Sequence, residues 1–344
     1  MTKNIKADSE IVYKLLSKKE NNFFNNKKIL LLGSDGFLGK YFTQYFYTLL
    51  NNGHKLTVDC VDNHISSDAS LNKPISVNKR INHYKRDVMK FNKKTKYDVI
   101  IFLAGIASPT IYKKYPLESL EVSYLGAKKF LEKSRLDKSL FVFFSSSEIY
   151  GNPDIKHIPT NEDYYGNVNP FGPRSCYDEG KRVGETLSYI YKNYFKTKIK
   201  IIRPFNIFGP GMAENDDRVI PRFVRAIKKN KPLTIYSNGK QTRSYCYISD
   251  GLFGFLKVIT KGKNGEIYNV GNDQQEISIN DLVKFIAKNV VNKVKTKKIN
   301  YPNNYPGNEP MRRSPDLNKI RKDTGFAPTV DLKESLIKFI NFYK

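Results

Sequence analysis

Short apolar runs alternate with amphipathic segments through the first two thirds of the chain. The runs are continuous in apolar residues, which is typical of strands buried on both faces of a parallel sheet. The segments between them have helical periodicity, and the first ends at Gly53, a frequent helix terminator. This order predicts a doubly wound α/β domain with helices on both faces of the sheet. The predicted strands are 27–33, 55–62, 81–88, 97–105, 139–147 and 198–206, and the predicted helices are 39–53, 116–135 and 176–194.

The pattern changes on either side of this region. Residues 1–26 are polar and lysine-rich, and the amphipathic stretch 9–19 predicts a short helix followed by a tether. We expect the sheet domain to cover 27–204. After residue 205, turn-rich segments alternate with short helices. We therefore expect 205–344 to form mainly a smaller substrate-binding domain, interleaved with the first through a segment near 242–262 that returns to the sheet.

The bulk composition is that of a folded globular protein of 344 residues with 40% hydrophobic residues. Three scattered cysteines, Cys60, Cys176 and Cys246, have no metal-ligand spacing and form no disulfide framework. The first residues lack the apolar core of a signal peptide, and no apolar run approaches transmembrane length. We expect a cytoplasmic protein without a metal site or membrane association.

The formal net charge of +26 raises the possibility of a nucleic-acid partner. Most of the cations are lysines, spread along the chain rather than gathered into one stripe with aromatic residues. Dispersed charge of this kind indicates a solvated surface. We expect no nucleic-acid partner, and the same charge would attract a polyanionic small substrate such as a sugar nucleotide.

A glycine-rich loop, "GSDGFLG", joins the first predicted strand to the first predicted helix. Gly33, Gly36 and Gly39 would let the backbone approach a pyrophosphate, which the N–H groups at the helix N-terminus would bind. The second strand ends at Asp62, whose carboxylate can accept hydrogen bonds from an adenosine ribose and would repel the extra phosphate of NADP. This favours a Rossmann domain that binds NAD. Asp87, at the end of the third strand, contacts the adenine amino group or simply caps the strand.

A polar cluster, "SSSEIYG", follows the fifth predicted strand, at the carboxyl edge where ligands bind in such sheets. Tyr177 and Lys181 lie one helical turn apart on the next predicted helix. A lysine cation beside a phenol lowers the pKa of the phenol, and the tyrosinate can then take a proton from a sugar hydroxyl as hydride leaves the same carbon. The Ser146 hydroxyl can orient that oxygen. Together with the glycine loop, this set indicates NAD-dependent redox chemistry on an alcohol.

From about residue 28 to its end, the chain resembles the extended short-chain dehydrogenase/reductase family of nucleotide-sugar enzymes, and within it the UDP-glucuronate decarboxylases. The resemblance implies a Rossmann fold, bound NAD, a UDP-sugar substrate and a homodimer built from helices near 116–135 and 177–194. The motifs that carry it are "SEIYG", "YYGNVNPFGPRSCYDEGKRVGETL", "RPFNIFGPGM", "DDRVIPRFV", "LTIYSNGKQTRSYCYISD", "YNVGN" and "RRSPD".

The resemblance also implies roles for individual residues. The expected catalytic residues are Ser146, Glu148, Tyr177, Lys181 and Arg243. Besides Tyr177 and Lys181, the expected NAD-binding residues are Gly33, Asp35, Gly36, Phe37, Leu38, Gly39, Asp62, Asp87, Leu103 and Ala104. The expected substrate-binding residues are Ser108, Ser147, Asn206, Arg218, Arg243 and Arg313.

Several positions depart from the pattern of the decarboxylases. The segment 102–109 reads "FLAGIASP", Ser123 replaces an asparagine, and Gly211 stands where a basic residue is common. These differences leave two other activities of the family open, 4-epimerisation and 4,6-dehydration of a UDP- or dTDP-sugar. Dehydratases of the family carry an acid at the position of Ser147 to protonate the leaving hydroxyl, and decarboxylation needs no such acid. The expected reaction is therefore conversion of UDP-glucuronate to UDP-xylose, and the alternative of another class is a non-catalytic Rossmann protein that binds nucleotide or RNA.

Overall fold

A seven-stranded, wholly parallel sheet forms the centre of the molecule. The computed structural model describes residues 2–65, 77–291, 294–301 and 310–342. The strands are, in spatial order, β11 (Ile267–Val270), β6 (Lys198–Pro204), β5 (Leu140–Phe144), β4 (Val99–Phe102), β1 (Lys27–Leu32), β2 (Leu56–Asp62) and β3 (Ile81–Lys85). All six predicted strands are present, and β11 is an additional one that the sequence pattern did not predict.

The strand order places a topological switch point between β1 and β4. The chain runs outward from β1 through β2 to β3, then crosses back to β4 on the other side of β1 and continues to β5 and β6. The central strands are apolar on both faces, and all residues from Ile29 to Leu32 in β1 are buried. In such a sheet the ligand crevice opens at the carboxyl ends of the strands beside the switch point.

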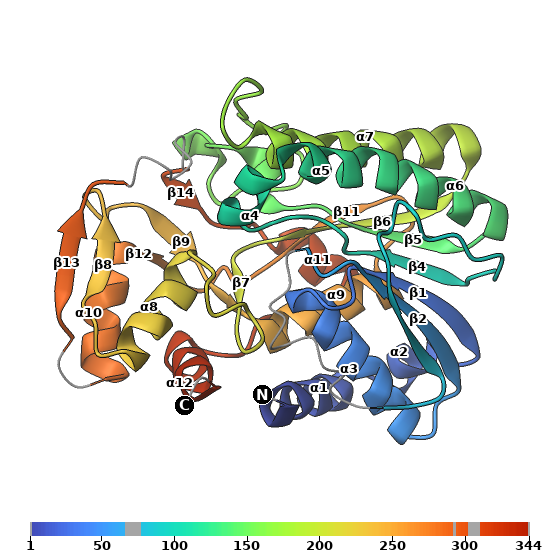
Figure 1. Ribbon diagram of the computed structural model, residues 1–344, viewed down its shortest axis with the longest axis horizontal. Helices are drawn as coiled ribbons and strands as arrows, with labels where there is room; N and C mark the ends of the chain where they lie inside the picture. Colours follow the sequence, from blue (N-terminus) through green and yellow to red (C-terminus); the bar gives the residue numbers. More distant parts are fainter. Residues whose placement is uncertain (1, 66–76, 292–293, 302–309, 343–344) are drawn as a thin grey trace.

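Helices cover both faces of the sheet, as predicted (Figure 1). One face is covered by α3 (Phe37–Asn51) and α9 (Ile248–Lys261), and the other by the three helical segments that lie side by side in Figure 1 as α5, α6 and α7. None of the helices in the described ranges is long and apolar enough to span a membrane. The three helices on the second face are α5 (Pro116–Glu121), α6 (Ala127–Asp137) and α7 (Ser175–Phe195). The short helix α4 (Pro109–Lys114) precedes them in the chain.

The predicted helix 116–135 is interrupted by a π-helical turn, η2 (Val122–Gly126), between α5 and α6. A π turn inserts an extra residue and rotates the helix face that follows it. Ser123 lies in this turn and is fully buried. It packs so closely against Gly180 of α7 that a Cβ added to Gly180 would come within 3.3 Å of the Ser123 Cβ. The segment that was predicted as one uniform helix is thus shaped by close packing against α7.

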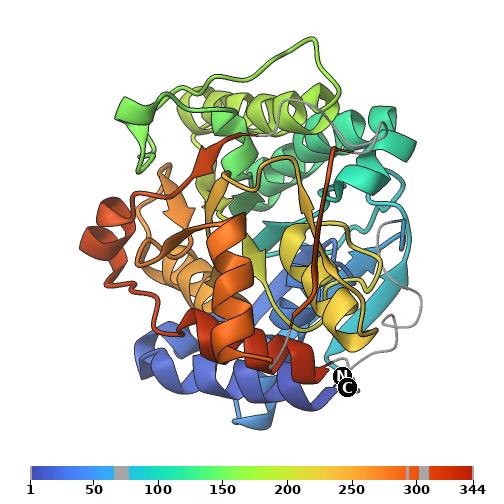
Figure 2. The same cartoon turned by 90° about the vertical axis from the view of Figure 1, so that its left-hand side faces the viewer.

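The later part of the chain forms small sheets and helices beside the carboxyl edge of the large sheet (Figures 1 and 2). Its segments are interleaved with the sheet domain, because α9 and β11 return to it. Two 3₁₀ turns, η3 (Ser147–Tyr150) and η4 (Ile155–His157), precede this part. Its remaining elements are β7 (Ile207–Phe208), α8 (Val219–Lys228), β8 (Leu233–Tyr236), β9 (Thr242–Ser244), β10 (Cys246–Tyr247), β12 (Glu276–Ser278), α10 (Ile279–Asn289), β13 (Thr296–Ile299), β14 (Arg312–Arg313), α11 (Asn318–Thr324) and α12 (Leu332–Phe342).

The N-terminal residues differ from the short helix and tether that the sequence predicted. They form α1 (Thr2–Leu15) and α2 (Lys18–Asn22), and α1 packs against α3 and α9. Ile5 and Val12 are fully buried, and the Tyr45 hydroxyl of α3 donates a hydrogen bond of 2.7 Å to the Asn21 side chain. A few apolar residues at helical spacing were enough to dock an otherwise polar segment, because they complete the core on that face of the sheet.

The three cysteines are free, and two of them, Cys60 and Cys246, are buried. Burial raises the pKa of the Cys246 thiol, so it stays protonated and behaves as a small apolar side chain.

The cytoplasmic location that we expected stays a prediction.

Candidate active site

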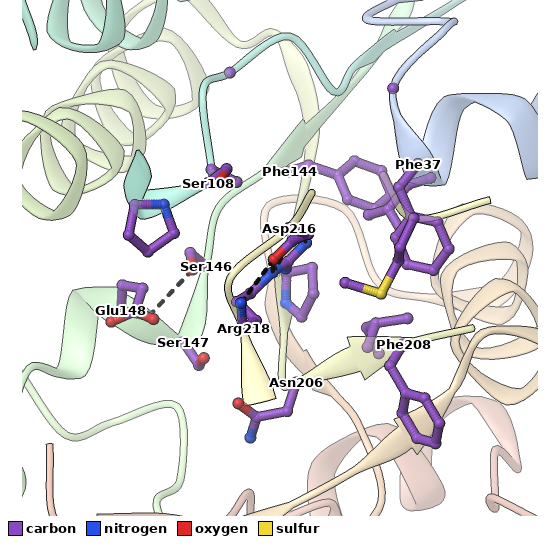
Figure 3. A pocket seen from close by; sticks show the side chains of 18 of the residues that line it. Phe37, Ser108, Phe144, Ser146, Ser147, Glu148, Asn206, Phe208, Asp216 and Arg218 are labelled. Carbon is purple, nitrogen blue, oxygen red and sulfur yellow. Dashed lines mark hydrogen bonds and ion pairs between the residues drawn. The ribbon is translucent and has the colours of Figure 1, made fainter. Parts of the chain in front are cut away.

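A cavity of about 310 Å³ opens at the carboxyl ends of β1, β4, β5 and β6, between the sheet domain and the smaller part of the molecule. A second cavity of about 130 Å³ continues from it toward β2 and β3. The two share four lining residues, Gly33, Gly36, Leu103 and Gly105, so together they form one elongated site. In the larger cavity, Ser146 and Glu148 lie on one side and Phe37 and Phe208 on the other (Figure 3).

The glycine loop leaves space that a larger residue would fill. Gly33 has φ +87°, and a Cβ there would come within 2.8 Å of the Ala104 backbone nitrogen. A Cβ on Gly39 would come within 2.1 Å of the Gly33 carbonyl oxygen, so the loop can lie tightly against α3 only as glycine. Gly36 is the N-cap of α3 and, as glycine, has no side chain that could cap that end of the helix. Its backbone N–H groups are therefore available to an anion, and this cradle fits the pyrophosphate of a dinucleotide.

The smaller cavity is lined by Asp62, Asp87 and Ala104. The Asp62 carboxylate accepts hydrogen bonds from the backbone N–H groups of Asp35 at 3.0 Å and His64 at 2.7 Å. Burial raises the pKa of Asp62, and these two hydrogen bonds oppose the shift. The Asp87 carboxylate accepts a hydrogen bond from the Met89 backbone N–H at 2.7 Å, as a strand-end cap does. Both carboxylates face the end of the elongated site that an adenosine would fill.

Ser146, Tyr177 and Lys181 all line the larger cavity. Ser146 is the second residue of the polar run after β5, and its hydroxyl caps η3 by accepting the Glu148 backbone N–H at 3.2 Å. The Lys181 ammonium donates to the Phe144 carbonyl at 2.8 Å and lies 5.8 Å from the centre of the Tyr177 ring. The last carbonyl of β5 therefore holds the lysine beside the tyrosine, and both of these side chains come from α7.

Burial sets the protonation of this group. It raises the pKa of Tyr177 to about 12, which is opposite in direction to the lowering that the sequence predicted, because burial outweighs the opposing interaction with Ser146. It lowers the pKa of Lys181 to about 8, so the cation loses its proton more readily than an exposed lysine does. The arrangement can hold a sugar hydroxyl between Ser146 and Tyr177 and carry its proton away.

Glu148 is enclosed by arginines. Arg313 contacts both of its oxygens, with two hydrogen bonds of 2.6 Å, and Arg174 forms a further ion pair with it. Burial opposes ionisation of Glu148, but the charges of Arg174 and Arg313 outweigh it and hold the pKa of Glu148 well below its usual range. Glu148 is therefore an ionised acceptor that orients two guanidinium groups toward the cavity.

Asp178 lies next to this cluster. Its Oδ2 is 3.4 Å from Nε of Arg174, and its buried Oδ1 has no hydrogen-bond partner among the described residues. Burial and the nearby charge of Glu148 raise the pKa of Asp178. With Arg174, Arg243 and Arg313 on one side and one fully ionised carboxylate on the other, the cluster has a surplus of positive charge facing the cavity.

The other expected substrate-binding residues line the same cavity from different elements. Ser108 is the N-cap of α4, and Ser147 is the first residue of η3. The Asn206 side chain donates to the Ser244 carbonyl at 3.1 Å. Arg218 is paired with Asp216 at 2.6 Å, a contact visible near the middle of the cavity in Figure 3.

The fold thus brings all the expected site residues to the two cavities. The larger one is lined by Gly33, Asp35, Gly36, Phe37, Leu38, Gly39, Leu103, Ser108, Ser146, Ser147, Glu148, Tyr177, Lys181, Asn206, Arg218, Arg243 and Arg313. The smaller one is lined by Asp62, Asp87 and Ala104 together with Gly33, Gly36 and Leu103. Their individual roles stay predictions.

Sequence reasoning missed Arg174, Tyr112 and Asp216 as lining residues. Arg174 stands three positions before Tyr177, within a motif that was used only for the tyrosine and lysine. Tyr112 stacks on Tyr177 with ring centres 5.8 Å apart, and its hydroxyl is buried. A tyrosine in a lysine-rich segment gives no local signal of such a position, because the contact depends on how α4 folds back over α7.

Comparison with known proteins places this site in context. The model of the NAD dependent epimerase/dehydratase family matches residues 29–271. UDP-glucuronic acid decarboxylase 1 of Xenopus tropicalis is 32% identical over 335 residues, which cover 96% of this chain and 74% of that protein. UDP-glucuronic acid decarboxylase 6 of Arabidopsis thaliana is 33% identical over 321 residues, which cover 92% of this chain and 89% of that protein.

Solved structures share the fold. The UDP-glucuronic acid 4-epimerase of Bacillus cereus, solved with UDP-glucuronic acid and NAD, is 25% identical, with a TM-score of 0.77 over 92% of this chain and 98% of that one. The dTDP-glucose 4,6-dehydratase of Streptomyces venezuelae, also solved with NAD, has a TM-score of 0.80 at 20% identity, over 92% of this chain and 96% of that one. At this identity, the likeness to the dehydratase shows only that the two proteins share a fold.

The Glu148 cluster generates a stability prediction. Glu148→Gln should lower the free energy of unfolding at neutral pH by about 2–4 kcal/mol, because it leaves two partly buried guanidinium groups without their counter-charge. A group whose pKa is depressed in the folded state stabilises the protein above its unfolded pKa and loses that effect as pH falls. The difference in the free energy of unfolding between the wild type and Glu148→Gln should therefore become smaller below about pH 4.5. Urea unfolding at a series of pH values measures both effects.

Glu276→Gln is the matched control, since Glu276 also binds an arginine with both oxygens but lies outside the cavities and pairs with the more exposed Arg312. We expect it to lower the free energy of unfolding by no more than about 1 kcal/mol. If both variants lose the same free energy of unfolding, the buried arginines around Glu148 do not depend on its charge more than Arg312 depends on Glu276, and the prediction is wrong.

Proposed function

The chain belongs to the NAD dependent epimerase/dehydratase family, and from that premise we propose that it converts UDP-glucuronate to UDP-xylose by transient oxidation at C4 of the sugar. The observation that carries the choice of reaction is the composition of the cavity beside Ser146 and Tyr177. It presents a surplus of guanidinium groups around Glu148 and a serine, Ser147, in place of an acid. Relatives that cover nearly the whole chain are decarboxylases of UDP-glucuronic acid, which supports the same substrate here.

Bound NAD supplies reversible hydride transfer at C4 of the sugar, and the residues that would hold it are those of the glycine loop, Asp62 and Lys181. Tyr177 accepts the proton of the C4 hydroxyl as that carbon becomes a ketone. Lys181 lies 5.8 Å from the centre of the Tyr177 ring, and its positive charge there opposes the burial that raises the pKa of Tyr177. Ser146 donates a hydrogen bond to the C4 oxygen and stabilises negative charge there.

Decarboxylation follows from the position of the new carbonyl. A carboxylate β to a ketone loses carbon dioxide readily, because the electrons of the broken C5–C6 bond move into the carbonyl and form an enolate. The enolate takes up a proton at C5, and reduction at C4 then regenerates the alcohol while Tyr177 returns its proton. No leaving hydroxyl is protonated in this sequence, which agrees with Ser147 at the position where a dehydratase needs an acid.

The arginine cluster explains the preference for an acidic sugar. Arg174 and Arg313 are oriented by Glu148, and Arg243 lines the same wall. A substrate carboxylate and a diphosphate bring negative charge into a site with surplus positive charge, in which water is partly excluded. A neutral hexose would leave that charge without a partner, and the site would discriminate against it.

The reaction can be tested directly by incubating the NAD-loaded protein with UDP-glucuronate and analysing the product by mass spectrometry. We expect loss of the mass of one carbon dioxide and, in heavy water, a single deuterium at C5 of the pentose. A product of unchanged mass and inverted C4 would identify a 4-epimerase, and loss of water from UDP-glucose or dTDP-glucose would identify a dehydratase. A protein that binds UDP-sugars and converts none of them would support the non-catalytic alternative.

Tyr177→Phe removes only the hydroxyl that we assign to proton transfer. Turnover should fall by about a hundred- to ten-thousand-fold while NAD stays bound, because the ring and its packing are retained. Steady-state kinetics and the nucleotide content of the purified protein measure the two effects. Tyr268→Phe is the control, since its hydroxyl binds Asp323 at 2.9 Å and the residue lines neither of the two cavities. Near-normal turnover in Tyr177→Phe would exclude this residue from the mechanism.

We also propose that the protein is a homodimer, as the family resemblance implies. Support comes from exposed apolar side chains on α5, η2 and α7, in the layer of helices that lie side by side in Figure 1. Large apolar side chains are well exposed there, among them Leu117 at 69% and Tyr194 at 75%. A second copy of the same surface would bury them in a self-complementary interface.

Light scattering should give twice the chain mass of 39.7 kDa for the wild-type protein. Introducing a charge on the proposed surface, as in Tyr194→Glu, should produce monomers, because an unpaired charge would be buried in the interface. Phe171→Glu is the matched control, since Phe171 is an even more exposed aromatic residue that lies outside these helices. A monomeric wild-type protein, or a dimer that is indifferent to both changes, would contradict the proposal.

A further inference from the structure

A buried carboxylate connects the N-terminal helix to both halves of the molecule. Asp8 on α1 is only 3% exposed. Its Oδ2 accepts hydrogen bonds from the hydroxyls of Tyr247 at 3.0 Å and Tyr41 at 3.4 Å. Tyr41 belongs to α3, which follows the glycine loop, and Tyr247 belongs to β10 in the later part of the chain. Burial raises the pKa of Asp8 to about 6, so its ionised carboxylate opposes folding at neutral pH. An apolar side chain would pack here without that cost, so packing alone does not explain a carboxylate at this position.

The contacts of Asp8 extend to one wall of the larger cavity. Tyr41 shares its single hydroxyl proton between Asp8 and the Pro210 carbonyl, which is closer at 3.0 Å and lies at the start of the turn whose next residues line the cavity. Gly211 in that turn has φ +93°, and a Cβ there would lie 3.4 Å from Cδ1 of Ile5, a fully buried residue one turn before Asp8 on α1. The N-terminal helix therefore underlies this turn directly.

Tyr247 provides the second connection to the cavity. Its strand, β10, pairs with β7 so that Tyr247 lies opposite Phe208, and the two rings meet edge to face with centres 6.0 Å apart. Phe208 and its neighbour Ile207 both line the cavity. Two charged residues of α12, Lys338 and Glu334, also influence Asp8.

We propose that α1 is a positioning element of the substrate site, and that Asp8 is the residue through which it holds the β7 strand and the turn at 209–213 against the sheet domain. The identity of the substrate in this inference rests on the proposed function. The physical basis is that Asp8 links α1 to two buried phenols. Its loss takes the acceptor away from the Tyr247 hydroxyl and leaves Tyr41 only its bond to the Pro210 carbonyl, so α1 no longer connects the two. Asp8 does not reach the reacting atoms and acts only through the wall that it supports.

The test compares Asp8→Ala with Ser9→Ala in the full-length, NAD-loaded protein. Ser9 is the neighbouring buried residue, and its hydroxyl lies 2.9 Å from the Thr48 hydroxyl of α3, so its loss affects only the packing of α1 on the sheet domain. In Asp8→Ala, amide hydrogen exchange in 207–218 should become about tenfold faster, and in Ser9→Ala it should stay as in the wild type. Asp8→Asn keeps an acceptor oxygen and should restore most of the protection.

Kinetics provide a second readout. Asp8→Ala should raise KM for UDP-glucuronate about tenfold and change kcat by less than about twofold, because binding is impaired and the reacting groups are intact. If Asp8→Ala does not fold, Tyr247→Phe removes one of the two attachments and should show the same changes to a smaller degree. The exchange measurement needs no substrate, so it decides the inference even if another sugar proves to be the substrate. Equal exchange in 207–218 for the Asp8 and Ser9 variants would overturn it.

Discussion

Parallel pairing of every strand in the large sheet is the constraint on which the site depends. Parallel strands have their carboxyl ends at one edge, so the loops that follow β1, β4, β5 and β6 must converge there. The glycine loop, the serine cluster and the turn at Pro210 are each attached to one of those strands or to its immediate continuation. The hydrogen bond between Lys181 and the Phe144 carbonyl shows the same constraint in one contact, because the end of β5 sets where a side chain of α7 can lie.

The electrostatics of the cavity follow from burial of charges that are only partly matched. Glu148 is ionised because Arg174 and Arg313 surround it, and Asp178 has a raised pKa because it is buried beside the charge of Glu148. A cluster of this kind adds little to folding stability, since desolvation of the charges offsets most of their attraction. Its value lies in holding guanidinium groups at fixed positions before an anionic substrate arrives, which reduces the reorganisation that binding would require.

The N-terminal helix shows how a segment outside the matched family region can become part of the working structure. The family model begins at residue 29, whereas Ile5 and Asp8 lie beneath a wall of the cavity. The helix contacts both the sheet domain and the later part of the chain, and these two parts meet at the site. An element at such a junction can influence the width of the cavity without contributing any group to the chemistry.

The sequence by itself determined the parallel α/β fold and the glycine loop. It also determined the set formed by Ser146, Tyr177 and Lys181, because each of these features follows from a local pattern of strand, turn and helix. It also indicated Glu148 and Arg313, but as separate residues. Only the tertiary structure decided that they form one bidentate pair, since they are 165 positions apart and no local pattern encodes that contact. The same holds for the π turn at Ser123 and for the docking of α1. Each depends on the shape of a distant surface, which exists only after the sheet and its helices have packed.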